Sequence, residues 1–228
     1  MLQFLDEFAD NPEALVAYFA AFAVAFITGI AFHEFSHAWA AYQLGDDTAA
    51  RRGRLTLNPI KHLDPMGTVL LALMGFGWGK PTPVSLARLR HGPKVGGALV
   101  ALAGPASNFA FAIIAALPLR LGLIDSVASF DQIDQASGAE IVGLFLVFVV
   151  WINVILGVFN LLPIPILDGF SVWTAFLPRG PWVQAQRFQA SYGVMILIGV
   201  FLVGLVLPGN PLGEVLVGIG DPIFDYIT

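Results

Sequence analysis

Four long uncharged stretches dominate the pattern of apolar and polar positions along the chain. They are residues 14–32, 95–119, 141–167 and 190–213. Each is long enough to cross a bilayer as an α-helix, which takes about 20 apolar residues. Charged residues, proline or glycine bound each stretch. The pattern therefore predicts an all-α polytopic membrane protein with about four transmembrane helices.

Breaks in the pattern refine where these helices begin and end. The third stretch contains Pro163 and Pro165, which cannot continue a regular helix, so we expect it to end near Leu162. Residues 182–192 come just before the fourth stretch. We expect them to form an interfacial helix that leads into it.

Two shorter segments predict irregular structure between the first two spans. Residues 66–79 are apolar but contain four glycines and are too short to cross, which indicates a re-entrant segment. Arg54–Asn58 alternates polar and apolar residues, which predicts a short strand. We expect this strand to be half of a membrane-associated β-hairpin.

The composition supports a membrane protein of one domain. The chain is 57% hydrophobic and only 12% charged, whereas an ordinary soluble domain is about a quarter charged. The apolar runs leave no room for a second domain, so residues 1–228 are expected to form one unit in the lipid bilayer. A net charge of −5 without a basic cluster excludes nucleic acid as the main partner.

The basic residues predict an orientation. Of the 11 lysines and arginines, eight lie between the first two apolar stretches and two more between the third and fourth. Because cytoplasmic loops carry an excess of Lys and Arg, loops 43–94 and 168–188 are expected in the cytoplasm and both termini outside. This describes a multi-pass protein of the cell (inner or plasma) membrane, with its catalytic side toward the cytoplasm.

The clearest chemical signal is the H-E-x-x-H pattern at residues 33–37, directly after the first apolar run. On a helix, His33 and His37 share one face and can bind one zinc ion, while Glu34 can polarise a metal-bound water. The alternative is a pair of interfacial histidines hydrogen-bonded to headgroups or backbone. Near membrane depth, however, such groups are costly unless they are paired or bound to metal.

A third protein ligand is needed for a catalytic zinc site, and the chain has no cysteine. His62 and His91 lie in the basic loop and are expected to be solvated. A carboxylate is the better candidate, and Asp168 is the only acidic residue attached to the end of an uncharged span. The alternative role for Asp168 is a helix N-cap for the segment that follows it.

Two further motifs resemble those of a known family. Asn160–Gly169 matches the pattern N-x-x-P-x-P-x-L-D-G at every fixed position, and Ala103–Asn108 resembles a G-P-x-x-N element. Together with the H-E-x-x-H pattern, they make residues 14–190 similar to the site-2 protease family of intramembrane zinc metalloproteases, peptidase family M50. The likeness is to its compact members, which lack a PDZ or CBS domain.

The resemblance implies roles for individual residues. One Zn²⁺ per chain would be held by His33, His37 and Asp168, with Glu34 as general base. Asn160 would steady the substrate carbonyl or the oxyanion; its alternative role is a helix–helix hydrogen bond. Gly104 and Asn108 are expected to support close helix packing.

The function implied is hydrolysis of peptide bonds within or next to transmembrane segments of other membrane proteins, that is, regulated intramembrane proteolysis. A membrane metal transporter is the main alternative, but spans two and four contain no ionisable residue to line a path. A catalytically inactive metal-binding scaffold is another, and the presence of Glu34 argues against it. Transmembrane protein substrates are the expected partners. A separate regulatory protein is a further candidate, since no sensory domain is present.

Overall fold

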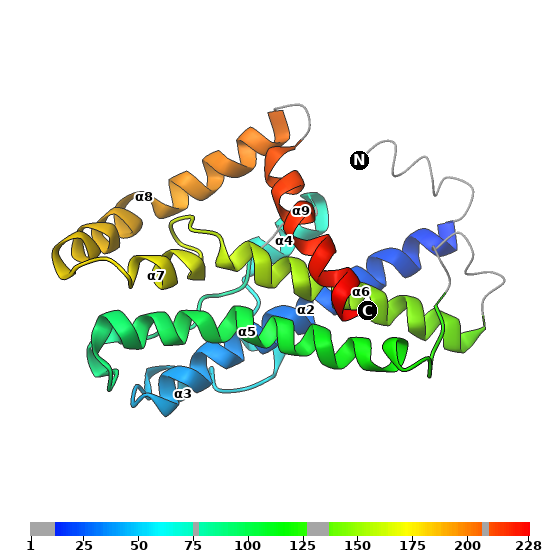
Figure 1. Ribbon diagram of the computed structural model, residues 1–228, viewed down its shortest axis with the longest axis horizontal. Helices are drawn as coiled ribbons and strands as arrows, with labels where there is room; N and C mark the ends of the chain where they lie inside the picture. The colour runs from blue at the N-terminus through cyan, green and yellow to red at the C-terminus, as the bar shows by residue number, and fades with distance from the viewer. Residues whose placement is uncertain (1–11, 75–77, 127–136, 207–209) are drawn as a thin grey trace.

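Four helices of the protein are long and apolar enough to cross a membrane. The computed structural model describes residues 12–74, 78–126, 137–206 and 210–228. Within them the candidate spans are Val16–Gln43, Gly92–Arg120, Gly138–Leu161 and Arg179–Gly204. They belong to helices α2 (Pro12–Gln43), α5 (Gly92–Arg120), α6 (Gly138–Leu161) and α8 (Arg179–Val206) (Figure 1). The predicted all-α class and number of spans are confirmed.

Shorter elements connect and flank the long helices. They are the helices α3 (Thr48–Arg51), α4 (Pro65–Met74), α7 (Asp168–Thr174) and α9 (Pro211–Ile227), with 3-10 turns η1 (Pro59–Lys61) and η2 (Leu86–Arg88). Elements α3, η1, α4 and η2 all lie between α2 and α5. This connection is therefore the most elaborate one in the described part of the chain.

Local chemistry explains where α6 begins and ends. The Ser137 side chain accepts from the Glu140 N–H while Glu140 accepts from the Ser137 N–H, a capping box that starts α6. Helix α6 ends at Leu161, just before Pro163, as predicted. Helix α8 runs without a break from Arg179 to Val206. The interfacial helix expected at residues 182–192 is thus the first part of the fourth span.

Helices α2, α5 and α6 pack closely and form the core (Figure 1). Ala25 of α2, Ala112 of α5 and Val150 of α6 are fully buried where the three helices meet. Small residues let helix backbones approach one another, which is how transmembrane helices gain packing energy. Ile227, at the end of α9, belongs to the same cluster and closes one side of it.

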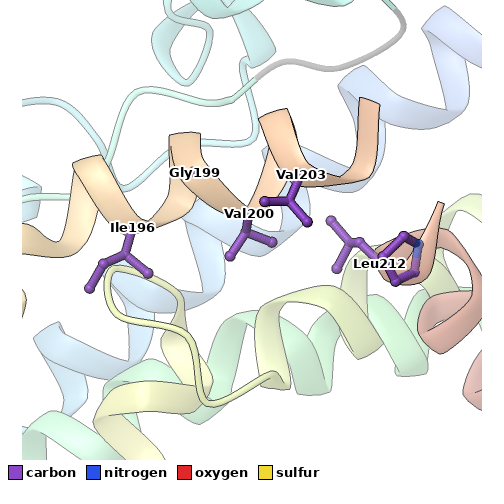
Figure 2. Close-up of a pocket in the computed structure, with 6 residues that line it drawn as sticks. Ile196, Gly199, Val200, Val203 and Leu212 are labelled. Atoms are coloured by element: carbon purple, nitrogen blue, oxygen red, sulfur yellow. The ribbon is translucent and has the colours of Figure 1, made fainter. Parts of the chain in front are cut away.

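Helix α8 stands apart from this three-helix core and packs against α9, with which it forms a hairpin (Figure 1). Between the two helices is an open groove of about 470 Å³. Figure 2 shows its lining of apolar side chains, which are Ile196, Val200 and Val203 from α8 and Pro211 and Leu212 from α9, beside Gly199. None of these lining residues is ionisable.

The predicted β-hairpin is wrong. Residues 54–58 form a loop, and within the described part of the chain the only β pairing is an isolated antiparallel bridge between Leu63 and Gly79. Side chains bond this loop to itself, because the Asn58 N–H donates to the Thr56 hydroxyl and the Asn58 side chain caps η1. Such local bonds compete with a strand ladder, and a five-residue alternation could not outweigh them.

The predicted re-entrant segment is not supported either. Most of residues 66–79 falls in α4, a regular ten-residue helix from Pro65 to Met74. Asp64 caps this helix by accepting from the N–H groups of Met66 and Gly67. Residues 75–77 of the predicted segment lie outside the described residues.

Candidate metal centre

Two histidines of α2 and the first residue of α7 converge on one point. The His33 Nε2 lies 3.0 Å from the Asp168 Oδ2, the His37 Nε2 lies 3.3 Å from it, and the two Nε2 atoms are 3.0 Å apart. Both histidines are buried. At a rise of 1.5 Å per residue, His37 is about 9 Å from the end of α2 at Gln43. The cluster therefore sits inside the helix bundle.

Buried amides fix the tautomer of His33. Its Nδ1 lies 2.7 Å from the Asn108 Oδ1. The Asn108 amide nitrogen donates to the Gly29 carbonyl and to the Asn153 Oδ1, which leaves its oxygen to face the imidazole. His33 must then donate from Nδ1, so in the neutral imidazole its Nε2 carries a lone pair. Asn153 in turn donates to the Val149 carbonyl, so this chain of amides ties α2, α5 and α6 together.

The backbone of α5 fixes the tautomer of His37 in the same way. Its Nδ1 lies 2.7 Å from the Val100 carbonyl, which can only accept. The His37 Nδ1 is therefore the donor, and its Nε2 also carries a lone pair. Metal-binding histidines are typically oriented by a hydrogen bond from the other ring nitrogen.

Three electron-pair donors thus face one another, and a cation between them would satisfy all three. Among the described residues, the Asp168 Oδ2 is buried without a hydrogen-bond donor, and His33, His37 and Asp168 form a group able to hold a metal ion. Tetrahedral ligands at zinc distances of about 2.0–2.1 Å are about 3.3 Å apart. The observed separations of 3.0–3.3 Å fit this spacing.

Gly104 of α5 leaves the room that the two imidazoles occupy. A Cβ atom at this position would lie 2.5 Å from the Nε2 and Cε1 of His37 and 2.6 Å from the Cε1 of His33. Any side chain here would displace the metal-facing edges of both rings. The expected role of Gly104 in close packing is therefore specific, because the surface it packs against is the pair of histidines.

Comparison with known proteins shows which family the chain belongs to. Residues 118–202 match the model of peptidase family M50. YwhC of Bacillus subtilis (strain 168) is 42% identical over 217 residues, which is 92% of this chain and 88% of YwhC. The chain belongs to peptidase family M50. Rip2 of Mycobacterium tuberculosis (strain ATCC 25618 / H37Rv) is 31% identical over 195 residues, 84% of this chain and 70% of Rip2.

The names of YwhC and Rip2 provisionally class both as zinc metalloproteases. No solved structure matches the chain. Membership of the family confirms the resemblance to site-2 proteases, and with the His33, His37 and Asp168 cluster it makes this chain a zinc metalloprotease of the M50 family.

Glu34 of this M50 protease is held from outside its own helix. The Thr82 N–H donates to the Glu34 Oε2 at 2.8 Å, and the Thr82 hydroxyl donates to the Glu34 carbonyl at 3.0 Å. Arg54 is buried close by. Burial lowers the pKa of its guanidinium, while the Glu34 carboxylate acts in the opposite direction.

The Asn160 side chain bonds to the backbone of its own helix. Its amide nitrogen donates to the Leu156 carbonyl at 2.9 Å, one turn earlier in α6, and its side chain is half-buried. The helix–helix hydrogen bond considered as an alternative is therefore not what the structure shows. A role for Asn160 at the oxyanion stays a prediction.

His62 and His91 do not belong to the group of possible metal ligands, and the alternative role of Asp168 as an N-cap is not what the structure shows. His62 is fully buried and its Nε2 lies 2.6 Å from the Thr56 carbonyl, so its expected solvation is wrong: the loop folds around it. His91 is exposed, as expected. Asp168 is not an N-cap, because Leu167 occupies that position of α7 and Asp168 is the first helical residue.

Proposed function

We propose that this M50 protease hydrolyses peptide bonds within or next to transmembrane segments of other membrane proteins. The observation that carries the proposal is the position of the ligand cluster. His33 and His37 lie in a candidate membrane-spanning helix, where Val100 and Asn108 of α5 bond to their rings and Asn153 of α6 bonds to Asn108. A site at this depth favours substrates that themselves enter the membrane.

In the proposed site one Zn²⁺ per chain is held by His33, His37 and Asp168. Bound zinc would supply a Lewis acid and lower the pKa of a coordinated water. Glu34 takes the proton of the attacking water and later delivers it to the leaving amine. Asn160 is proposed to donate to the developing oxyanion through its second amide N–H, since the first is bonded to the Leu156 carbonyl.

The proposed orientation places loops 43–94 and 168–188 in the cytoplasm and both termini on the outer side of the cell membrane. Contacts of the structure support it. Lys94 donates to the Leu177 carbonyl, so the two basic loops lie at the same end of the bundle. At the end of α5 away from these loops, Arg120 donates to the Tyr226 carbonyl and lies beside the C-terminus.

Labelling of single cysteines tests this orientation without background, because the chain has no cysteine. Arg52 and Leu123 are exposed positions at opposite ends of the bundle. An impermeant thiol reagent applied to intact cells should label Leu123→Cys and spare Arg52→Cys. The reverse pattern would overturn the proposed topology.

Cleavage of a purified model transmembrane substrate tests the function itself. Zinc chelation should abolish cleavage, and added zinc should restore it, with the cut mapped by mass spectrometry inside or beside the transmembrane segment. Glu34→Gln should keep its zinc and lose about 10²–10⁴ in rate, the usual contribution of a proton-transfer group.

Four outcomes would contradict the proposal. Zinc uptake into liposomes without proteolysis would favour a transporter. Zinc binding with neither activity would favour an inactive scaffold. Cuts confined to soluble loops would remove the intramembrane part of the proposal. Full cleavage by Glu34→Gln would reject Glu34 as the base.

A further inference from the structure

A short proline-rich segment runs against Glu34. This segment, Gly79–Pro83, has the sequence G-K-P-T-P, and we call it the strap. Its residue Thr82 makes both hydrogen bonds to Glu34 described above, one to the carboxylate and one to the carbonyl. The strap thus touches the side chain that is proposed to carry the proton.

The sequence of the strap leaves a single backbone N–H in residues 81–83 to bond to the carboxylate. Pro81 and Pro83 have no N–H, so Thr82 provides the only backbone donor of the three residues. Proline also fixes its own φ and keeps the preceding residue extended, which restrains Lys80 and Thr82. The donor is therefore presented by a backbone with little freedom to turn away.

The strap is anchored independently of Glu34. The Lys80 N–H donates to the His62 carbonyl at 2.7 Å, and the Lys80 carbonyl accepts from the Arg54 guanidinium. Arg54 and His62 are both buried, so these anchors are enclosed by protein. The strap is thus held by contacts of its own in addition to those that Thr82 makes to Glu34.

Close approach of the strap to α2 requires glycine at its first position. A Cβ atom at Gly79 would lie 2.9 Å from the Ile30 Cγ2 and 3.2 Å from the His62 carbonyl oxygen, and 3.8 Å from the Glu34 Oε1. The strap therefore passes both carboxylate oxygens. It hydrogen-bonds Oε2 through Thr82 and leaves Oε1 without a described donor.

We propose that Thr82 is the positioning residue for Glu34: its N–H holds one carboxylate oxygen so that the other faces the attacking water. A free glutamate side chain samples several rotamers, and a proton-transfer group must lie within hydrogen-bond reach of the proton it takes. The inference rests on the proposed role of Glu34 as base. It adds a residue from a loop that contributes no metal ligand.

Graded substitutions at Thr82 test the proposal by kinetics on the model substrate. Thr82→Ser keeps both donors, so its turnover should equal that of the wild type. Thr82→Val loses the hydroxyl alone and should lose a few-fold in kcat at most. Thr82→Pro loses both donors and should lose roughly 10- to 100-fold in kcat, the range for hydrogen bonds to charged groups. KM and zinc content should stay unchanged in all three.

Two further variants test the strap as a structure: one is a control and the other displaces the strap. Lys80→Ala removes an exposed side chain from the same segment and should leave kcat and KM unchanged. Gly79→Ala pushes the strap from α2 while keeping Thr82 itself, so it should reproduce the kcat loss of Thr82→Pro. Gly79→Ala also decides the matter if Thr82→Pro does not fold. Normal kcat in both disruptive variants, or a rise in KM with kcat intact, would overturn the proposal.

Amide hydrogen exchange tests the contact without any activity. The Thr82 amide should exchange slowly in the wild type and in Glu34→Gln, whose side-chain oxygen still accepts, and faster in Glu34→Ala. Equal exchange in the wild type and Glu34→Ala would reject the contact. If protection depends on Glu34 but Glu34→Gln cleaves normally, the contact stands and the proposed role of Glu34 as base fails instead.

Discussion

Replacing Gly104 by alanine should release the metal while leaving the fold in place. The added Cβ would lie 2.5 Å from the His37 Nε2, where ordinary contacts begin at 3.4 Å, a shortfall of about 0.9 Å. Sound metal sites keep their distances within about ±0.2 Å. A shift of the ring large enough to relieve the clash therefore takes Nε2 out of ligand geometry. We expect zinc affinity to fall by at least about 100-fold, the upper range for losing an orienting partner.

Zinc content after dialysis and competition with a chromophoric chelator measure this loss directly. Gly97→Ala is the matched control in the same helix, because its Cβ would meet only the end of the flexible Leu86 side chain, at 3.0 Å. Gly97→Ala should keep its zinc, and both variants should show the same helix content by circular dichroism. Full zinc with unchanged chelator competition in Gly104→Ala would refute the steric reasoning.

Three further substitutions test other parts of the structure. Asp168→Ala should abolish stoichiometric zinc by elemental analysis; full occupancy would exclude it as a ligand. Asn153→Ala removes the acceptor of the amide that orients His33, so chelator competition should show zinc affinity about 10–100-fold weaker. Burial raises the pKa of Asp46, but hydrogen bonds from Thr48 and Ser85 outweigh it and set the pKa below its ordinary value. Its stabilisation is therefore present above about pH 4 and lost as pH falls below it. Thermal melts should show this loss in the wild type and not in Asp46→Ala.

The three residues of the candidate metal centre could be picked out because their signals are local. His33 and His37 lie one helical turn apart, so the helix alone brings them to one face. Asp168 was found from two facts, the missing third ligand and a carboxylate directly after a proline-broken span. The structure places all three atoms together. The C-terminal end of α6 followed equally from Pro163, because proline acts on the backbone beside it.

The residues that orient the ligands were missed or misjudged, because their roles depend on contacts between distant segments. Asn108 was assigned to helix packing, yet it bonds His33 across 75 positions of the chain. Asn153 was overlooked, although an amide in the middle of an uncharged span is itself a signal. Nothing in the sequence linked Thr82 to Glu34, which lies 48 positions earlier in the chain. The strand at Arg54–Asn58 failed for a related reason, since buried side chains of the loop decide its course.

Metal binding and helix packing are coupled in this protein. The polar atoms at the centre of the bundle come from three helices: His33 from α2, Asn108 from α5 and Asn153 from α6. Unsatisfied polar groups at membrane depth cost several kcal/mol each, so these side chains favour the one packing that pairs them all. That packing brings the Nε2 atoms of His33 and His37 to Asp168, in an arrangement that can hold a metal ion. The interactions that specify how the helices pack are therefore the same ones that shape the metal centre.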